Sequence, residues 1–325
     1  MVIQVIAALA LTFLITVIAC PVFIKRMRQL QYGQQIREDG PSSHSLKAGT
    51  PTMGGLVFIP AATLSSIIFA GASPLLYTLL LLTLGCGLLG FLDDYLKVTH
   101  NRSLGLKARS KLAGEAITAA IFLVILQQLN IYSSTITLPF TALDFDLGYF
   151  YPLFIFLIIT SASNSVNLTD GVDGLAAGTA AIALLAYIYI AWLTGQSETA
   201  VFAAALAGAC LGFLIFNRNP ARIFMGDAGS LALGGAFAAL AVLTKTELLL
   251  LIIGGVFVVE TLSVIIQVAS FKLFGRRVLR MSPLHHHFEL QGWSEWHVAR
   301  TFWGAAVVFA AVGMFAYRFQ FGATH

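Results

Sequence analysis

Long apolar runs separated by short polar segments dominate the pattern of hydrophobic and polar positions along this chain. A transmembrane helix needs about 20 consecutive, mainly apolar residues, and ten stretches approach or reach that length. They run approximately over residues 2–24, 51–71, 75–95, 111–130, 150–166, 175–194, 199–216, 228–243, 247–272 and 301–319. The pattern predicts an all-α polytopic membrane protein with about ten transmembrane helices. We expect residues 1–325 to form a single integral membrane domain.

Composition agrees with the membrane assignment. Of the 325 residues, 58% are hydrophobic and 10% are charged, whereas a soluble domain carries about 25% charged residues. The first apolar segment is long enough to span a membrane, and its basic cluster follows it, so we interpret it as a helix rather than as a signal peptide. The three cysteines lie in or beside apolar runs and offer neither a disulfide framework nor metal-ligand spacing.

The basic residues predict an orientation. Of the 19 Lys and Arg residues, all except Lys245 and Arg318 fall in one alternate set of predicted loops. Cytoplasmic loops carry the excess of Lys and Arg in membrane proteins, so we assign this side to the cytoplasm. An even number of spans then places both termini outside the cytoplasm, together with a short β-hairpin predicted around 131–149. The basic loops also attract anionic lipid headgroups and phosphorylated substrates; no nucleic-acid partner is expected.

Aspartates gather at the cytoplasmic ends of the predicted spans. A charge at the centre of a membrane helix costs about 2.5–3.5 kcal/mol, so these carboxylates require a cation, a wet cavity or a metal ion. Lys97 follows Asp93 by four residues and Asp94 by three, which brings it within reach of both on a helix. Magnesium takes oxygen ligands and shares them with phosphates. The alternative is that each aspartate caps a helix by itself. The full set is Asp93, Asp94, Asp170, Asp173 and Asp227.

Two of these aspartates belong to the block SNSVNLTDGVDGLAAG at 163–178. Asn164, Asn167, Asp170 and Asp173 recur every three residues there, and they offer the donors and acceptors that a sugar or a nucleobase needs. Asp170 and Asp173 are alternatively caps of the next helix.

Asp227 lies in the block FNRNPARIFMGDAGS at 216–230, just before an apolar helix. It suits a helix N-cap. Because a helix N-terminus also attracts anions, Asp227 equally suits a carboxylate that holds Mg²⁺ against a diphosphate.

Two further blocks carry polar chemistry. SPLHHHFE at 282–289 contains three consecutive histidines. Adjacent side chains on a helix point about 100° apart, so we favour phosphate or nucleotide contacts from His285, His286 or His287 over a single zinc site. HSLKAGTPTMGG at 44–55 pairs Lys47 with a turn that leads into the second predicted span.

Together these blocks resemble one family, the phospho-N-acetylmuramoyl-pentapeptide transferases. The aspartate pair alone indicates only the wider superfamily of polyprenyl-phosphate N-acetylhexosamine-1-phosphate transferases, and the TPTMGG and HHHFE blocks narrow the resemblance. The motifs occur in the expected order: TPTMGG at 50–55, LDDYLK at 92–97, NLTDGVDGL at 167–175, FNxxPAxxFMGDxGS at 216–230 and PLHHHFE at 283–289.

The resemblance implies a reaction and a setting. Phospho-MurNAc-pentapeptide passes from UDP-MurNAc-pentapeptide to undecaprenyl phosphate, which forms lipid I and releases UMP in the first membrane step of peptidoglycan synthesis. Members of the family require Mg²⁺ and are typically homodimers. We therefore expect a multi-pass protein of the bacterial cytoplasmic membrane, in contact with membrane lipid, whose active-site cleft faces the cytoplasm.

The resemblance also implies roles for individual residues. Asp227 is expected to bind Mg²⁺. Asp93 is expected to act as a base or to orient the lipid phosphate, assisted by Asp94. Orientation alone would suffice, because a phosphate monoester is largely ionised near neutral pH. Lys97 and Lys111 are expected to neutralise phosphates, with Arg109 as an alternative to Lys111.

The remaining candidates are implied by the same resemblance. Further catalytic candidates are Asn217, His285, His286 and His287. The expected substrate-binding residues, which line the uridine and diphosphate site, are Lys47, Thr52, Asn167, Asp170, Gly171, Asp173, Phe224, Gln267 and His286. Phe224 would stack on uracil, although a lone aromatic residue in a motif also suits packing.

Three other functions compete. A sister transferase would use a UDP-N-acetylhexosamine without the peptide. A secondary transporter would also carry buried carboxylates and broken helices, but the acidic residues of this chain cluster at one face rather than at the midplane. A non-catalytic lipid-binding scaffold would not need five carboxylates around one cleft.

Overall fold

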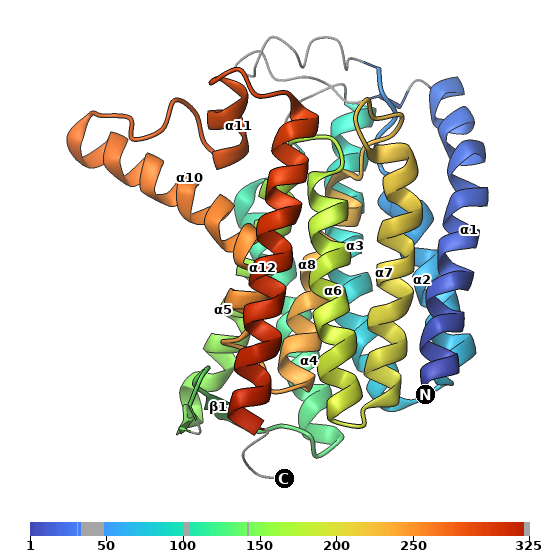
Figure 1. Ribbon diagram of the computed structural model, residues 1–325, viewed down its shortest axis with the longest axis vertical. Helices are drawn as coiled ribbons and strands as arrows, with labels where there is room; N and C mark the ends of the chain where they lie inside the picture. The colour runs from blue at the N-terminus through green and yellow to red at the C-terminus, as the bar shows by residue number, and fades with distance from the viewer. Residues whose placement is uncertain (31, 34–48, 101–104, 142, 322–325) are drawn as a thin grey trace.

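The computed structural model describes residues 1–30, 32–33, 49–100, 105–141 and 143–321. Most of the long helices run side by side along the longest axis of the molecule (Figure 1). The helices are α1 (Val2–Gln29), α2 (Gly55–Ala70), α3 (Pro74–Thr99), α4 (Ala108–Gln128), α5 (Tyr151–Thr169), α6 (Leu175–Leu193), α7 (Ser197–Asn217), α8 (Gly226–Leu243), α9 (Leu250–Ile253), α10 (Gly255–Phe274), α11 (Leu284–Glu289) and α12 (Glu295–Phe321). Two strands, β1 (Thr135–Thr137) and β2 (Asp144–Asp146), pair antiparallel, and a 3₁₀ turn, Gly148–Phe150, precedes α5.

In the part of the chain that the structure describes, nine helices are long and apolar enough to cross a membrane: α1, α3, α4, α5, α6, α7, α8, α10 and α12. The prediction of an all-α multi-pass membrane protein is therefore confirmed. The tenth predicted segment, 51–71, is the apolar helix α2, which has 16 residues. It packs against α1, α7 and α8 inside the bundle.

The ninth predicted segment, 247–272, is two helices rather than one. The helix is interrupted at Gly254, between α9 and α10. Helix α10 then projects from the bundle as an arm (Figure 1). Gly255 lies so close to the ring of Phe309 on α12 that a Cβ there would overlap it. The hydrophobic run is continuous across this interruption and does not predict it. The local signal is the pair of consecutive glycines, Gly254 and Gly255, because glycine has a low helix propensity.

Glycine contacts bring three helices together where α8 begins. A Cβ on Gly90 of α3 would overlap the backbone of Asp227, and a Cβ on Gly55 of α2 would overlap that of Gly229. Small residues let the backbones of membrane helices approach closely. The last third of α3 and the first turn of α2 are thereby held against the N-terminus of α8.

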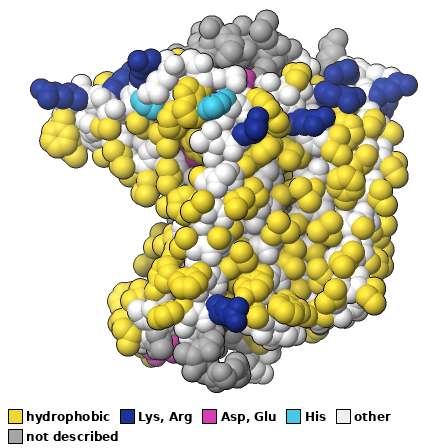
Figure 2. All heavy atoms as spheres, in the orientation of Figure 1, with side chains coloured by type: hydrophobic (Ala, Val, Ile, Leu, Met, Phe, Trp, Pro, Cys, Tyr) yellow, Lys and Arg dark blue, Asp and Glu magenta, His cyan; other side chains and the backbone are white. Residues whose placement is uncertain are grey.

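The two ends of the bundle differ in charge. The start of α1, the end of α12 and the hairpin share the lower end in Figure 1, and α11 lies at the upper end. Lys and Arg side chains gather along the upper end in Figure 2. Within the range predicted as a hairpin, 131–149, strands β1 and β2 pair antiparallel, with Thr135 opposite Asp146. Which end faces the cytoplasm stays a prediction.

Candidate active site

Three aspartates from two helices meet at the junction of α3 and α8. Each of Asp93, Asp94 and Asp227 offers a carboxylate oxygen, and these oxygens lie within 4.8 Å of one another. Asp93 and Asp94 are buried. Asp94 Oδ2 accepts a hydrogen bond of 3.0 Å from the backbone N–H of Ala228, which fastens the first turn of α8 to α3. The packing of α3 against α8 thus brings the three carboxylates together.

Two lysines each form ion pairs with more than one of these carboxylates. The Lys97 ammonium lies 2.6 Å from Asp93 Oδ2 and 3.1 Å from Asp227 Oδ2. The Lys111 ammonium lies 3.2 Å from Asp93 Oδ1 and 2.7 Å from Asp227 Oδ2. Helical spacing predicted the contact of Lys97 with Asp93. Of the two alternatives at the start of α4, the structure brings Lys111 to the aspartates, whereas Arg109 is exposed.

Helix α5 contributes Asn167 to the same cluster. Its side-chain amide donates to Asp227 Oδ1 over 2.9 Å and to the Ser230 hydroxyl over 2.8 Å. Asp170 follows at the end of α5. Burial raises the pKa of its carboxyl well above the usual range, and the negative charges of Asp227 and Asp94 raise it further.

The alternative that these aspartates are N-caps is wrong. The residue at the N-cap of α6 is Gly174, and the residue at the N-cap of α8 is Met225. Asp227 lies inside the first turn of α8 instead. Separate capping therefore does not explain why the carboxylates are concentrated here.

Asp173 and Asn217 hold two connections together. Asp173 Oδ2 accepts hydrogen bonds from Asn219 Nδ2 over 3.0 Å and from the Ala221 N–H over 2.9 Å. Asn217, which is buried, accepts from the Gly174 N–H over 3.1 Å and donates to the Ile223 carbonyl over 3.0 Å. The α5–α6 loop is thereby tied to the α7–α8 connection.

The three consecutive histidines of α11 point to different partners. His285 is buried, with Nδ1 3.2 Å from Glu260 Oε2 on α10. His286 Nδ1 lies 2.7 Å from Glu289 Oε2, and His287 Nδ1 accepts from the Arg280 N–H over 3.1 Å. In the described residues the histidines form no common metal site, and the one group with metal-binding spacing is the aspartate cluster.

Other predicted binding residues lie around these elements. Gly171 faces His285 so closely that a Cβ there would overlap the ring. Gln267 of α10 accepts from the Val278 and Leu279 N–H groups over 2.9 Å each, which folds the α10–α11 connection back onto α10. The backbone of Phe224 bonds Pro51 and Gly54, so the TPTMGG segment, with the buried Thr52, runs beside the start of α8. Lys47 lies outside the described residues.

The aspartate cluster fits a hard divalent cation. Two oxygens on one Mg²⁺ lie at most about 4.2 Å apart, because each Mg–O bond is about 2.1 Å long. The 4.8 Å spread of the three carboxylates is close to that limit. Two ammonium groups already lie among these oxygens, so the cluster attracts positive charge. Small side-chain movements would bring the oxygens onto one ion.

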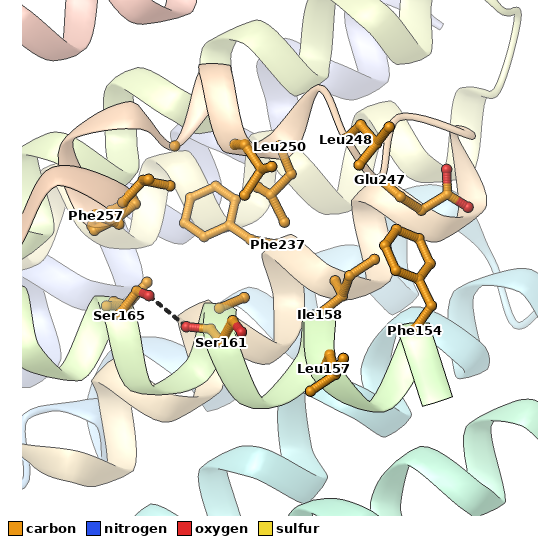
Figure 3. Close-up of a pocket in the computed structure, with 15 residues that line it drawn as sticks. Phe154, Leu157, Ile158, Ser161, Ser165, Phe237, Glu247, Leu248, Leu250 and Phe257 are labelled. Carbon is orange, nitrogen blue, oxygen red and sulfur yellow. Dashed lines mark hydrogen bonds between the residues drawn. The ribbon is translucent and has the colours of Figure 1, made fainter. Parts of the chain in front are cut away.

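An apolar pocket lies on the face of α5 opposite to the one that bears Asn167 (Figure 3). Its α5 wall runs from Phe154 to Val166, about 18 Å at 1.5 Å per residue, and includes Ser161 and Ser165. Phe237 of α8, Leu250 of α9 and Phe257 of α10 close the other side. Helix α5 therefore separates a charged cluster from an apolar pocket.

Two buried glutamates in this region, Glu115 on α4 and Glu260 on α10, are not among the site residues predicted from the sequence. Each lies within a predicted span, and a charge inside an apolar run is the signal that would have marked them.

Comparison with known proteins gives the family. A family model described as "Glycosyl transferase family 4" matches residues 76–245, and one described as "Phospho-N-acetylmuramoyl-pentapeptide-transferase signature 1" matches residues 47–59. A relative named phospho-N-acetylmuramoyl-pentapeptide-transferase from Geobacillus kaustophilus is 55% identical over 96% of this chain and 97% of its own length. Its namesake from Bacillus subtilis is 52% identical over 93% of this chain and 94% of its own length. The chain therefore belongs to the phospho-N-acetylmuramoyl-pentapeptide transferase family.

Proposed function

We propose that this protein transfers phospho-MurNAc-pentapeptide from UDP-MurNAc-pentapeptide to undecaprenyl phosphate, which yields lipid I and UMP. The observation that carries the proposal is the cluster of Asp93, Asp94 and Asp227 with Lys97 and Lys111, in a chain of this family. The signature match at 47–59 favours the muramoyl-pentapeptide substrate over a UDP-N-acetylhexosamine.

The chemistry requires two phosphorylated substrates to meet. An oxygen of the lipid phosphate attacks the sugar-linked phosphorus of the donor, a new P–O–P bond forms, and the bond to the UMP oxygen breaks. Both substrates are anionic, so the barrier falls when positive charge is placed where negative charge gathers. Lys97 and Lys111 carry that charge, and they contact Asp227 from two different helices.

Asp227 is the proposed principal ligand of Mg²⁺, with Asp93 and Asp94 as further oxygen donors. When bound, the ion supplies charge neutralisation and a template for the diphosphate. Asn167 holds Asp227 Oδ1 in place from α5. The lysines that now contact Asp227 are then the groups that turn to the substrate phosphates.

For Asp93 we propose an orienting role. Its side chain is fixed by the Leu106 N–H, which donates to Oδ1 over 2.7 Å, and by the Lys97 ammonium. A phosphate monoester is already largely ionised near neutral pH, so it needs little help from a base. Asp94, bonded to the N-terminus of α8, supports the same arrangement.

The nucleotide is proposed to bind among the loops beside α11. The binding residues proposed from the resemblance are Thr52, Asn167, Asp170, Gly171, Asp173, Phe224, Gln267 and His286, with Phe224 stacking on uracil. Lys47 belongs to the same proposed set and lies outside the described residues. His285, His287 and Asn217 support this region. The contacts of Asn217 and Asp173 with backbone groups favour a role in holding the loops.

The polyprenyl tail is proposed to lie along the apolar pocket beside α5. The residues that line the pocket run along α5 from Phe154, in its first turn, to Val166, in its last turn. Figure 2 shows the flank beneath the α10 arm hollowed and covered with hydrophobic side chains. A lipid in this position would place its phosphate near the end of α5.

The proposed orientation in the membrane follows from the difference in charge between the two ends of the bundle. We propose that the end rich in Lys and Arg, which carries the active site, faces the cytoplasm of a bacterial cell, because that end carries the basic excess. We also propose a homodimer, on the resemblance to the family alone.

The test uses purified protein and two donors. We expect UMP release from UDP-MurNAc-pentapeptide when undecaprenyl phosphate and Mg²⁺ are present, and none from UDP-N-acetylglucosamine. Turnover of the second donor in place of the first would contradict the proposed substrate.

A further inference from the structure

Glu115 is a buried carboxylate that the proposed mechanism does not use. It lies on α4, and its side chain is 1% exposed. Its Oε1 accepts two hydrogen bonds from α5, one of 2.6 Å from the Ser163 hydroxyl and one of 2.9 Å from the Asn164 amide. One oxygen therefore joins two membrane helices.

The same two helices deliver groups to Asp227. Lys111 precedes Glu115 by four residues on α4, and Asn167 follows Ser163 by four residues on α5. Residues four apart lie on one face of a helix, about 6 Å apart along its axis. Lys111 and Asn167 hold the two oxygens of the Asp227 carboxylate, at 2.7 and 2.9 Å. Helices α4 and α5 are thus joined at two levels, through Asp227 and, one turn deeper, through Glu115.

The surroundings leave α5 little freedom at this level. Gly234 of α8 lies so close to Ser163 that a Cβ there would overlap its backbone. Ser163 is therefore held between α8 and Glu115. On the other face of α5, Ser161 and Ser165 line the apolar pocket (Figure 3). A rotation of α5 would move Asn167 and the pocket wall together.

We propose that Glu115 is a positioning residue that fixes α5 against α4, so that Asn167 and Lys111 meet on Asp227. It acts through these side chains and does not touch substrate. The inference rests on the proposed function for its effect on turnover. Losing these two hydrogen bonds would leave Ser163 and Asn164 bonded to the Thr160 carbonyl of their own helix. The link from α5 to α4 at this level would then be lost, and the two helices could shift against each other.

The test compares Glu115→Gln with Glu115→Leu. The amide oxygen of Gln still accepts from Ser163 and Asn164, whereas Leu fills the space without an acceptor. A displacement of about 1 Å at a reacting group costs on the order of 10²-fold in rate. We therefore expect Glu115→Leu to lower kcat for UMP release by about that factor, with little change in KM for the donor. Glu115→Gln is expected to stay within about threefold of wild type.

A second readout does not depend on turnover. Hydrogen exchange at the amides that end α5, around residues 165–170, reports local opening. We expect faster exchange there in Glu115→Leu and wild-type exchange in Glu115→Gln. Thr118→Val is the matched control, since Thr118 is a buried polar residue of α4 whose hydroxyl, among the described residues, donates to the Gly114 carbonyl of its own helix and not to α5. It is expected to match wild type in both readouts.

A double-mutant cycle closes the test. Ser163→Ala removes the α5 donor of the same hydrogen bond to Glu115. Its effect on kcat and on hydrogen exchange should be much smaller in the Glu115→Leu background than in wild type. It also serves if Glu115→Leu does not fold. Additive effects, equal losses in Gln and Leu, or wild-type kcat and exchange in Leu would overturn the inference. If wild type releases no UMP, the proposed function fails, and hydrogen exchange alone then decides the role of Glu115.

Discussion

The two ends of the bundle each bury charged side chains, but they balance them differently. At the hairpin end, one lysine meets one glutamate: Lys245 lies 3.5 Å from Glu247 Oε1, and it donates to the carbonyls of Ser133 and Thr135. At the other end, within the described residues, Asp93, Asp94 and Asp227 share two lysines, Lys97 and Lys111. The pair of Lys245 and Glu247 is balanced in charge and holds a loop in place. The cluster of three aspartates and two lysines has excess negative charge and can attract a further cation.

The pKa shifts of two carboxyl groups outside the membrane-spanning helices differ in the same way. Burial raises the pKa of Glu247, and the Lys245 ammonium counteracts that rise. Burial also raises the pKa of Asp170, but Asp227 and Asp94 add to the rise because they carry like charge. Like charges gathered at one site are costly for stability, and such costs are common at functional sites.

The largest expected effect comes from removing the shared carboxylate. We expect Asp227→Ala to lower UMP release by about 10³-fold or more, since it removes the proposed metal ligand and the anchor of both lysines. The rate that remains should respond weakly to Mg²⁺. Lys245→Met, at the opposite cluster, is the control and should keep near-normal turnover. Near-normal turnover in Asp227→Ala would refute the metal role.

The lysines come next. Lys111→Met should reduce kcat by about 10²-fold, because it removes positive charge that the phosphates need. Arg109→Ala tests the alternative from the same turn of α4 and should leave kcat near wild type. If Arg109→Ala lost the activity and Lys111→Met kept it, the assignment of the phosphate contact would be reversed.

Asp93→Asn separates orientation from base catalysis. We expect a loss of about 10²-fold in kcat that is constant across pH, because the amide keeps the shape but not the charge that holds Lys97. The measurement is the pH profile of UMP release for both proteins. A loss that shrinks steadily as pH rises would support a base instead.

How much of this site could be predicted depends on sequence distance. The contact between Lys97 and Asp93 follows from helical spacing. The contacts of Asp227 with Lys111 and Asn167 join residues 116 and 60 positions apart, and no local pattern encodes them. The motifs indicated that these residues matter, and glycine packing between α3 and α8 determines where they meet.

The fold divides in the same way. Hydrophobic length located the long helices, because burial in lipid requires about 20 apolar residues regardless of partners. It could not locate the break at Gly254, which depends on the Phe309 ring packed against Gly255. The charge of Glu115 inside an apolar run was a signal in the sequence, but no local pattern identifies its partners, Ser163 and Asn164, which lie 48 and 49 residues away.

A smaller effect is expected on stability at the active-site end. Without Mg²⁺, Asp170→Asn should raise the Tm by a few degrees near neutral pH. The folded protein holds the Asp170 proton to a higher pH than the unfolded chain, whose carboxyl has a pKa of about 4. Wild-type stability therefore falls as pH rises from about 4 through the raised pKa, while the Asn variant escapes this loss. A Tm gain that did not grow with pH would contradict this account.

The smallest expected effect on activity comes from the balanced cluster. Lys245→Met should lower stability by about 1–3 kcal/mol, since it removes the donor to the Ser133 and Thr135 carbonyls and the ammonium beside Glu247, which keeps the Tyr151 hydroxyl as a donor. Thermal unfolding in detergent measures the loss, and kcat should remain within about twofold of wild type. A large loss of kcat at unchanged stability would mean that the hairpin end takes part in transfer.

The central claim is that the under-neutralised cluster carries out a metal-assisted phosphoryl transfer. The most direct measurement follows UMP and lipid I together, using the purified wild-type protein, UDP-MurNAc-pentapeptide and undecaprenyl phosphate, with Mg²⁺ or with a chelator. We expect equal amounts of the two products with Mg²⁺ and neither product with the chelator. Absence of UMP under both conditions, or equal turnover in both, would contradict it.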